Sequence, residues 1–90
     1  MHAVTIDRPA LPPPDRLTLW PVEGGRFGLD ATFSGAFGQA YAKEHRAALK
    51  VGGLKASLRR DRAAEDTWVL RMGPLTADAA RLAVDAFLGL

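Results

Sequence analysis

Two adjacent glycines, Gly24 and Gly25, separate two stretches in which apolar and polar residues alternate. Alternation with a period of two is typical of a strand that is buried on one face. A glycine pair supplies the positive φ angles that a two-residue hairpin turn requires. The segment LTLWPVEGGRFGLDATF therefore predicts an antiparallel hairpin over residues 17–33. No other local pattern in the chain constrains the fold as strongly.

A two-residue turn at the glycine pair would also fix which residues of the hairpin face each other. Because opposed residues share a face of the sheet, Trp20 would lie opposite Leu29 on the core face. That face would carry Trp20, Val22, Phe27, Leu29, Ala31 and Phe33. Leu17 and Leu19 would then lie on the outer face without a cover. Pro21 has no N–H, so we expect its strand at an edge of the sheet.

The next segment, SGAFGQAYAKEHRAALKVGG, predicts a helix. Ser34 is a suitable N-cap, and Gly52 is suitable for ending the helix. The apolar stripe of this helix would consist of Phe37, Ala40, Tyr41, Ala48 and Val51. His45 is interpreted as a surface residue of the helix.

A second hairpin is expected from LKASLRRDR and TWVLRM, which a polar connection joins. The core face would carry Leu54, Ala56, Leu58, Trp68, Leu70 and Met72. The outer face would carry Lys55, Ser57, Arg59, Thr67, Val69 and Arg71. Gly73 and Pro74 are expected to end the last strand, and Thr76 to cap a second helix. The apolar face of that helix would consist of Ala80, Val84, Phe87 and Leu88.

The predicted elements follow the order strand, strand, helix, strand, strand, helix. We expect an α+β fold with an antiparallel four-stranded sheet and both helices on one face, as in a ferredoxin-like or SPOR-like two-layer sandwich. Residues 17–90 would form this single domain. The proline-rich residues 1–16 are interpreted as an arm, in which AVTID is either a short strand or part of an unstructured tail.

Charge and composition narrow the function. The ninety residues have no cysteine, so neither a disulfide nor a Cys-based zinc site stabilises the fold. The net charge is only +2, but residues 43–62 contain seven Lys and Arg against two acids. The residues expected to contact a polyanion are Lys50, Lys55, Arg59, Arg60, Arg62 and Arg71. Without a signal-like or membrane-spanning segment, a cytoplasmic location without a membrane partner is expected.

Catalytic chemistry is not expected. His2 and His45 are the only histidines, and neither has a second ligand at metal-binding spacing. Ser34 and Ser57 lie outside any nucleophile motif. The paired glycines lack the spacing that cradles phosphate groups. We therefore predict a protein that is not an enzyme and needs no cofactor or metal.

The segment TWVLRMGPLTADAARLAVDAFL carries two family resemblances. It resembles the closing strand, Gly-Pro turn and helix of SPOR domains, which are peptidoglycan-binding modules with the order strand, helix, strand, strand, helix. Counted from Phe27, the predicted elements have that order. The segment is also similar to the last strand and helix of AP2-type DNA-binding domains. The two resemblances imply different ligands and cover about a quarter of the chain.

Three functional hypotheses follow from these patterns. The favoured one is a protein-binding module that forms a homo-oligomer or binds another protein through Leu17, Leu19 and Val69 on an exposed sheet face or edge. The second is an accessory protein that binds nucleic acid through its basic sheet face. The third is a glycan-binding module of SPOR type, which works outside the cytoplasm.

Overall fold

The computed structural model describes residues 11–90, so the strand predicted in AVTID lies outside the described residues. The chain forms strands β1 (Arg16–Val22) and β2 (Arg26–Ser34), helix α1 (Gly38–Val51), strands β3 (Ser57–Arg60) and β4 (Thr67–Leu75), and helix α2 (Ala77–Leu88). This order confirms the predicted ββαββα arrangement and the α+β fold class.

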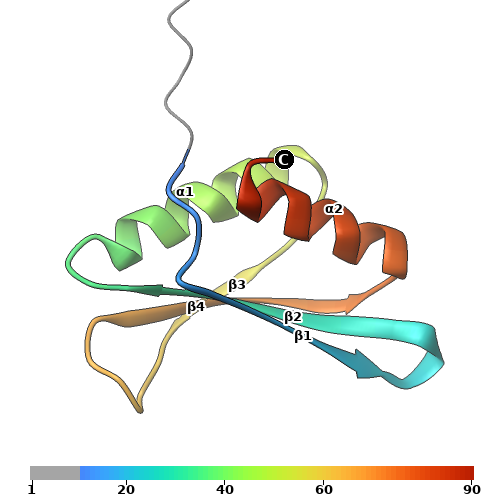
Figure 1. Ribbon diagram of the computed structural model, residues 1–90, viewed down its shortest axis with the longest axis horizontal. Coiled ribbons are helices and arrows are strands. Elements are labelled where there is room, and N and C mark those ends of the chain that lie inside the picture. The colour runs from blue at the N-terminus through green and yellow to red at the C-terminus, as the bar shows by residue number, and fades with distance from the viewer. Residues whose placement is uncertain (1–10) are drawn as a thin grey trace, which may run out of the picture.

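The four strands form one antiparallel sheet in the order β1-β2-β4-β3. Both helices lie on the same side of this sheet (Figure 1). The opposite side, called the outer face below, is not covered by any helix of residues 11–90. From β2 onward the elements run strand, helix, strand, strand, helix, which is the order that the SPOR resemblance implied. Strand β1 pairs with the remaining edge of β2 and completes the sheet.

The first hairpin has a different register from the predicted one. Glu23–Gly25 form a three-residue turn, so Leu19 pairs with Leu29 and Trp20 pairs with Gly28. The extra turn residue moves every side chain of β1 to the opposite face. Leu17 packs against the buried core on the helix side, and Trp20 lies on the outer face. The predicted faces of these residues were therefore wrong. In the actual register Leu17 is half-buried against the core, whereas the predicted register left it uncovered.

Within β3 and β4, most residues of the second hairpin lie on the predicted faces, but Thr67, which was expected on the outer face, is buried. Leu58 pairs with Leu70, and Arg59 pairs with Val69, so the leucines face the helices and Arg59 faces outward. Strand β4 does not end at Gly73. It continues through a bulge and a cis Gly73-Pro74 bond to Leu75, which pairs with Phe27. A bulge accommodates a proline that an unbroken ladder would exclude.

Helix α1 begins later than predicted and buries a different stripe. Ser34 ends β2 rather than capping the helix, and Phe37 and Val51 are exposed. The buried positions are Gly38, Ala42, His45 and Leu49, which have helical spacing. Hydropathy does not indicate this stripe, because a glycine and a histidine occupy half of it.

His45 is buried rather than exposed. Its ring lies between Phe33 and Phe87, with ring centroids 5.1 and 5.5 Å away. Its Nε2 lies 2.7 Å from the carbonyl oxygen of Pro12. A carbonyl oxygen can only accept, so Nε2 carries the proton and donates it. His45 thereby links helix α1, the core and the segment that precedes β1.

Helix α2 agrees with the prediction at its start. The backbone N–H of Ala79 donates to Thr76 Oγ1 over 3.1 Å, which makes Thr76 the N-cap. Ala80, Ala83 and Phe87 are buried, whereas Leu88 is half exposed. The core beneath both helices consists of Leu29, Ala31, Phe33, Ala42, Leu49, Leu70, Met72, Ala83 and Phe87.

Candidate functional site: two basic surfaces

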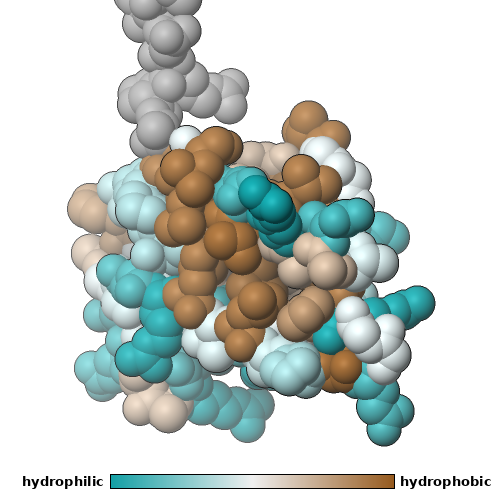
Figure 2. All heavy atoms as spheres, turned by 45° about the vertical axis from the view of Figure 1, so that its right-hand side comes forward, coloured by the Kyte–Doolittle hydropathy of each residue, from teal (hydrophilic) through white to brown (hydrophobic). Residues whose placement is uncertain are grey.

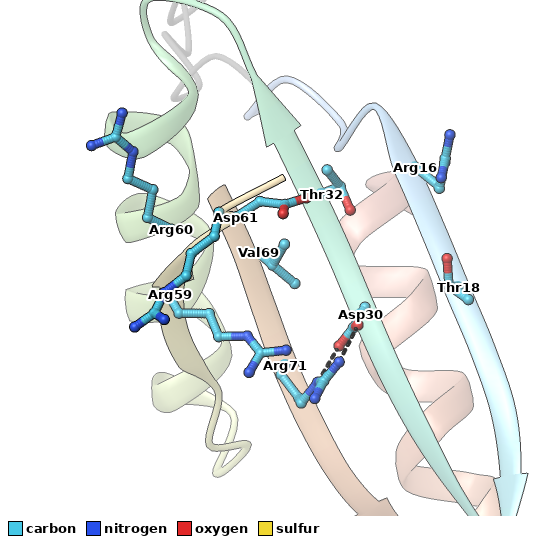
Figure 3. Close-up of a pocket in the computed structure, with 10 residues that line it drawn as sticks. Arg16, Thr18, Asp30, Thr32, Arg59, Arg60, Asp61, Val69 and Arg71 are labelled. Carbon is cyan, nitrogen blue, oxygen red and sulfur yellow. Dashed lines mark hydrogen bonds and ion pairs between the residues drawn. The ribbon is translucent and has the colours of Figure 1, made fainter. Parts of the chain in front are cut away.

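The outer face holds a shallow hollow of about 860 Å³. We call it the arginine face. It is lined by Arg16, Thr18, Asp30, Thr32, Arg59, Arg60, Asp61, Arg62, Val69 and Arg71. All four strands contribute, so the surface runs across the whole sheet (Figure 3). Five of the lining residues are arginines and two are aspartates, which leaves a formal charge of +3.

Arg71 and Asp30 form the centre of the arginine face. They occupy opposed positions of β4 and β2, so their side chains meet on the same side of the sheet. Arg71 Nε donates to Asp30 Oδ1 at 2.8 Å, and its Nη2 donates to Oδ2 at 2.9 Å. These hydrogen bonds and the charge of Asp30 raise the pKa of the Arg71 guanidinium. The pair has the planar two-bond geometry that fixes both groups in place.

Trp20 lies beside this pair on the outer face. The guanidinium carbon of Arg71 is 5.5 Å from the centre of the Trp20 ring, within cation–π range. A Cβ atom at Gly28, the residue paired with Trp20, would overlap the indole ring. Glycine at this position therefore gives the ring room to lie against the sheet. The result is an aromatic surface next to a fixed charge pair.

The remaining lining residues differ in their direction. Arg59 extends toward Arg71, and Asp61 points toward Thr32 and Val69 (Figure 3). Arg60 points away from these side chains, past the edge of the sheet. Val69 is half-buried and forms an apolar part of the floor. The arginine face thus offers donors, acceptors and apolar contact within one surface.

A second basic surface lies between α1 and the segment before β3. We call this groove of about 510 Å³ the lysine groove, and its lining is Lys43, Arg46, Ala47, Lys50, Leu54, Lys55 and Ala56. Four of these seven residues are cationic and none is acidic. The apolar residues Ala47, Leu54 and Ala56 lie among the cations. The groove differs from the arginine face because none of these seven described residues has a carboxylate.

The six predicted polyanion contacts are divided between the two surfaces. Arg59, Arg60, Arg62 and Arg71 line the arginine face, whereas Lys50 and Lys55 line the lysine groove. The expected position of Lys55 on the outer face was therefore wrong. It precedes β3, where the extended segment runs beside α1.

The three predicted interface residues lie on opposite sides of the sheet. Leu17 and Leu19 belong to the helix side of the sheet, and Val69 belongs to the outer face. Leu19 keeps 49% of its surface exposed, because β1 is an edge strand. One interface on the outer face cannot use all three residues. A role for each residue in binding stays a prediction.

The site contains residues that the sequence patterns did not indicate. Arg16 joins the arginine face, and Trp20 lies beside it, once the hairpin has its three-residue turn. Asp30 was expected on the outer face, but not as the partner of Arg71. The useful signal was Gly28, since a glycine within a strand often leaves room for a large side chain or close backbone. In the lysine groove, Lys43 and Arg46 were missed as partners of Lys50, although the three share one face of a helix.

The chain matches no known family model, no curated protein and no solved structure. Within the part of the chain that the structure describes, no helix is long and apolar enough to cross a membrane. In the same residues 11–90, no three His, Asp or Glu side chains come together to hold a metal ion.

Proposed function

We propose that the chain is a glycan-binding module that holds an extended, carboxylate-bearing glycan strand across the arginine face. The observation that carries this proposal is the mixture of groups on that face. Arginines lie among Asp30, Asp61, Thr18 and Thr32 around a hollow with Trp20 at its side. A polymer that has both hydroxyls and carboxylates would use all of these groups.

Hydroxyl groups explain the acidic residues better than phosphate groups do. A sugar hydroxyl donates one hydrogen bond and accepts others, so it can pair with a carboxylate and a guanidinium at once. A phosphate group at neutral pH mainly accepts, and Asp30 and Asp61 would repel it. The Trp20 ring offers an apolar face with a polar N–H, which suits the amphipathic surface of a sugar ring.

Peptidoglycan is the glycan that we propose. The order of the elements from β2 to α2 supports it, because the SPOR resemblance implies that order and a glycan ligand. Peptidoglycan lies outside the cytoplasm. The proposal therefore replaces the cytoplasmic location expected from the sequence with an extracytoplasmic one, which fractionation of cells that produce the untagged protein would test.

The proposal is tested by cosedimentation of the purified protein with peptidoglycan sacculi. The wild-type protein is expected to pellet with sacculi in a saturable manner. Replacement of Arg59 and Arg71 by glutamine removes two charged donors, each worth about 1.5–3 kcal/mol when bound to a charged partner. We therefore expect the affinity of the double variant to fall at least about tenfold.

A matched variant separates this site from a general charge effect. Lys43→Gln with Lys50→Gln removes the same charge from the lysine groove, and it should leave sacculus binding within about twofold of wild type. An equal loss in the two double variants would mean that net charge alone attracts the protein to sacculi. That result, or no pelleting of the wild-type protein, would contradict the proposal.

Single-stranded nucleic acid is a second candidate ligand, and Trp20 is the observation that favours it. Proteins that bind single strands stack bases on aromatic side chains of a four-stranded sheet and track the backbone with basic residues. Asp30→Asn distinguishes the candidates. It should strengthen binding of a labelled single-stranded oligonucleotide by removing a repulsive charge, and it should weaken binding to sacculi by removing a strong acceptor. Nanomolar oligonucleotide binding by the wild-type protein would favour nucleic acid.

A further inference from the structure

We propose that the lysine groove and the free edge of β3 form a second binding site, which takes an acidic, extended segment of another protein as an added strand. The site shares Arg60 with the arginine face, but its other cations are different, and it does not rest on the glycan proposal. Its cations lie on the helix side of the molecule, on α1 and on the segment before β3.

The spacing of the cations on α1 gives the groove its charge. Lys43, Arg46 and Lys50 are three and four residues apart, so they follow one face of the helix. Lys55 adds a fourth cation from the opposite side of the groove. With no acidic residue in the lining, a ligand with negative charges at short intervals complements this surface.

The floor of the groove limits which anionic ligand fits. Ala47, Leu54 and Ala56 supply apolar surface between the cations. Leu54 and Ala56 are half-buried and pack against the core, so this surface is fixed in position. A ligand that alternates acidic and apolar side chains matches both the cations and the floor.

The edge of the sheet indicates that the ligand is a peptide. Among residues 11–90, β3 is the last strand of the sheet and pairs with β4 alone, so within these residues the backbone N–H and C=O groups of its other edge have no strand partner. These groups bind an extended peptide as a further strand. The guanidinium of Arg60 points past this edge, where it would meet a carboxylate of the added strand (Figure 3). Polysaccharides and nucleic acids lack the regular amide groups that this edge can pair.

Fluorescence anisotropy with a labelled ten-residue peptide of alternating Glu and Val tests the proposal. The wild-type protein is expected to bind this peptide, and Lys50→Glu with Lys55→Glu should weaken binding at least tenfold. Arg16→Glu with Arg62→Glu reverses the same number of charges on the arginine face and should change the affinity less than about threefold. Equal losses in the two variants would overturn the proposal.

A second peptide tests strand addition itself. The same sequence with N-methyl groups on alternate residues keeps all charges but loses the N–H groups on one edge. One of the two N-methylation patterns should abolish binding and the other should preserve it, because an added strand pairs through one edge only. Binding of both patterns as tightly as the parent peptide would show charge attraction without strand pairing and would overturn the proposal. So would no binding of the parent peptide.

Discussion

The two basic surfaces of this molecule differ in how their charges are held. On the arginine face, Arg71 is fixed by Asp30 and lies beside Trp20, and the other arginines surround them on the outer side of the sheet. In the lysine groove, four cations surround apolar residues, and no carboxylate of residues 11–90 forms a salt bridge with them. A restrained guanidinium keeps its direction, whereas a lysine ammonium on a flexible stem adapts its position.

This difference indicates different kinds of recognition. Fixed donors beside fixed acceptors select a ligand with a defined arrangement of hydroxyls and carboxylates. Free cations around an apolar floor attract any acidic chain, and the backbone edge of β3 then supplies the direction of binding. The net charge of the whole chain, only +2, hides both surfaces because acidic residues elsewhere offset them.

The largest effect on stability should come from His45→Ala. This substitution removes contacts that position the lysine groove and leaves the residues of the arginine face unchanged. His45 fixes α1 against the core, so α1 would lose its position relative to the segment 54–56 that completes the lysine groove. Loss of a large buried side chain costs about 2–5 kcal/mol. Urea denaturation should show this decrease in the free energy of unfolding. Under conditions where the variant is folded, binding of the acidic peptide should fall more than binding to sacculi.

Lys43→Ala on the exposed side of the same helix is the matched control. A surface substitution of this kind changes the free energy of unfolding by less than about 0.5 kcal/mol. Equal stability of the two variants would mean that the contacts of His45 with Phe33, Phe87 and Pro12 do not position α1.

Gly28→Ala should have a smaller effect on stability and should break the arginine face instead. The added Cβ would overlap the Trp20 ring, so the indole must leave its position beside Arg71. We expect a loss of about 1–3 kcal/mol in the free energy of unfolding. Sacculus binding should fall several-fold, and the Trp fluorescence maximum should shift. Peptide binding in the lysine groove should stay unchanged.

Gly52→Ala provides the control for this substitution. A Cβ atom at Gly52 would be 3.5 Å from its nearest neighbour, an ordinary contact, and the backbone there has a negative φ of −83°. This variant should bind sacculi as the wild-type protein does. Unchanged fluorescence and binding in Gly28→Ala would contradict the proposed role of Trp20.

The sequence correctly predicted that Leu58 and Leu70 face the core, that Arg59 and Arg71 face outward, and that Thr76 caps α2. The alternation of the two strands and the cap residue each allow one arrangement. The register of the first hairpin depended on one turn residue. A loop that starts at Glu23 turns Leu17 toward the helices, whereas a loop of the glycine pair alone would have turned Trp20 toward them. Residue types alone do not decide between these two registers, because a shift of one residue exchanges the two faces of the strand and both faces of β1 contain large apolar residues.

The stripe of α1 was missed for a different reason. Burial of His45 depends on two aromatic rings and on a carbonyl from residue 12, which are distant in sequence. Local periodicity contains no information about such partners. Because the predicted register of the first hairpin was wrong, Trp20 was expected on the core face. The aromatic residue beside the arginine face was therefore missed.

The smallest expected effect is on the oligomeric state of the protein. Its measurement tests whether an apolar surface binds a second copy of the chain, in addition to the two basic surfaces that bind other ligands. Apolar side chains form a band on the side of the molecule shown in Figure 2. Leu19 is 49% exposed on edge strand β1, so burial of its free surface would contribute on the order of 1 kcal/mol per subunit. We expect sedimentation velocity at tens of micromolar to show a weak oligomer that Leu19→Glu shifts toward monomer. Val69→Glu, on the outer face, should leave the mass unchanged and weaken sacculus binding. A monomer in all three proteins would exclude self-association, and an effect of Val69→Glu on mass would move the interface to the arginine face.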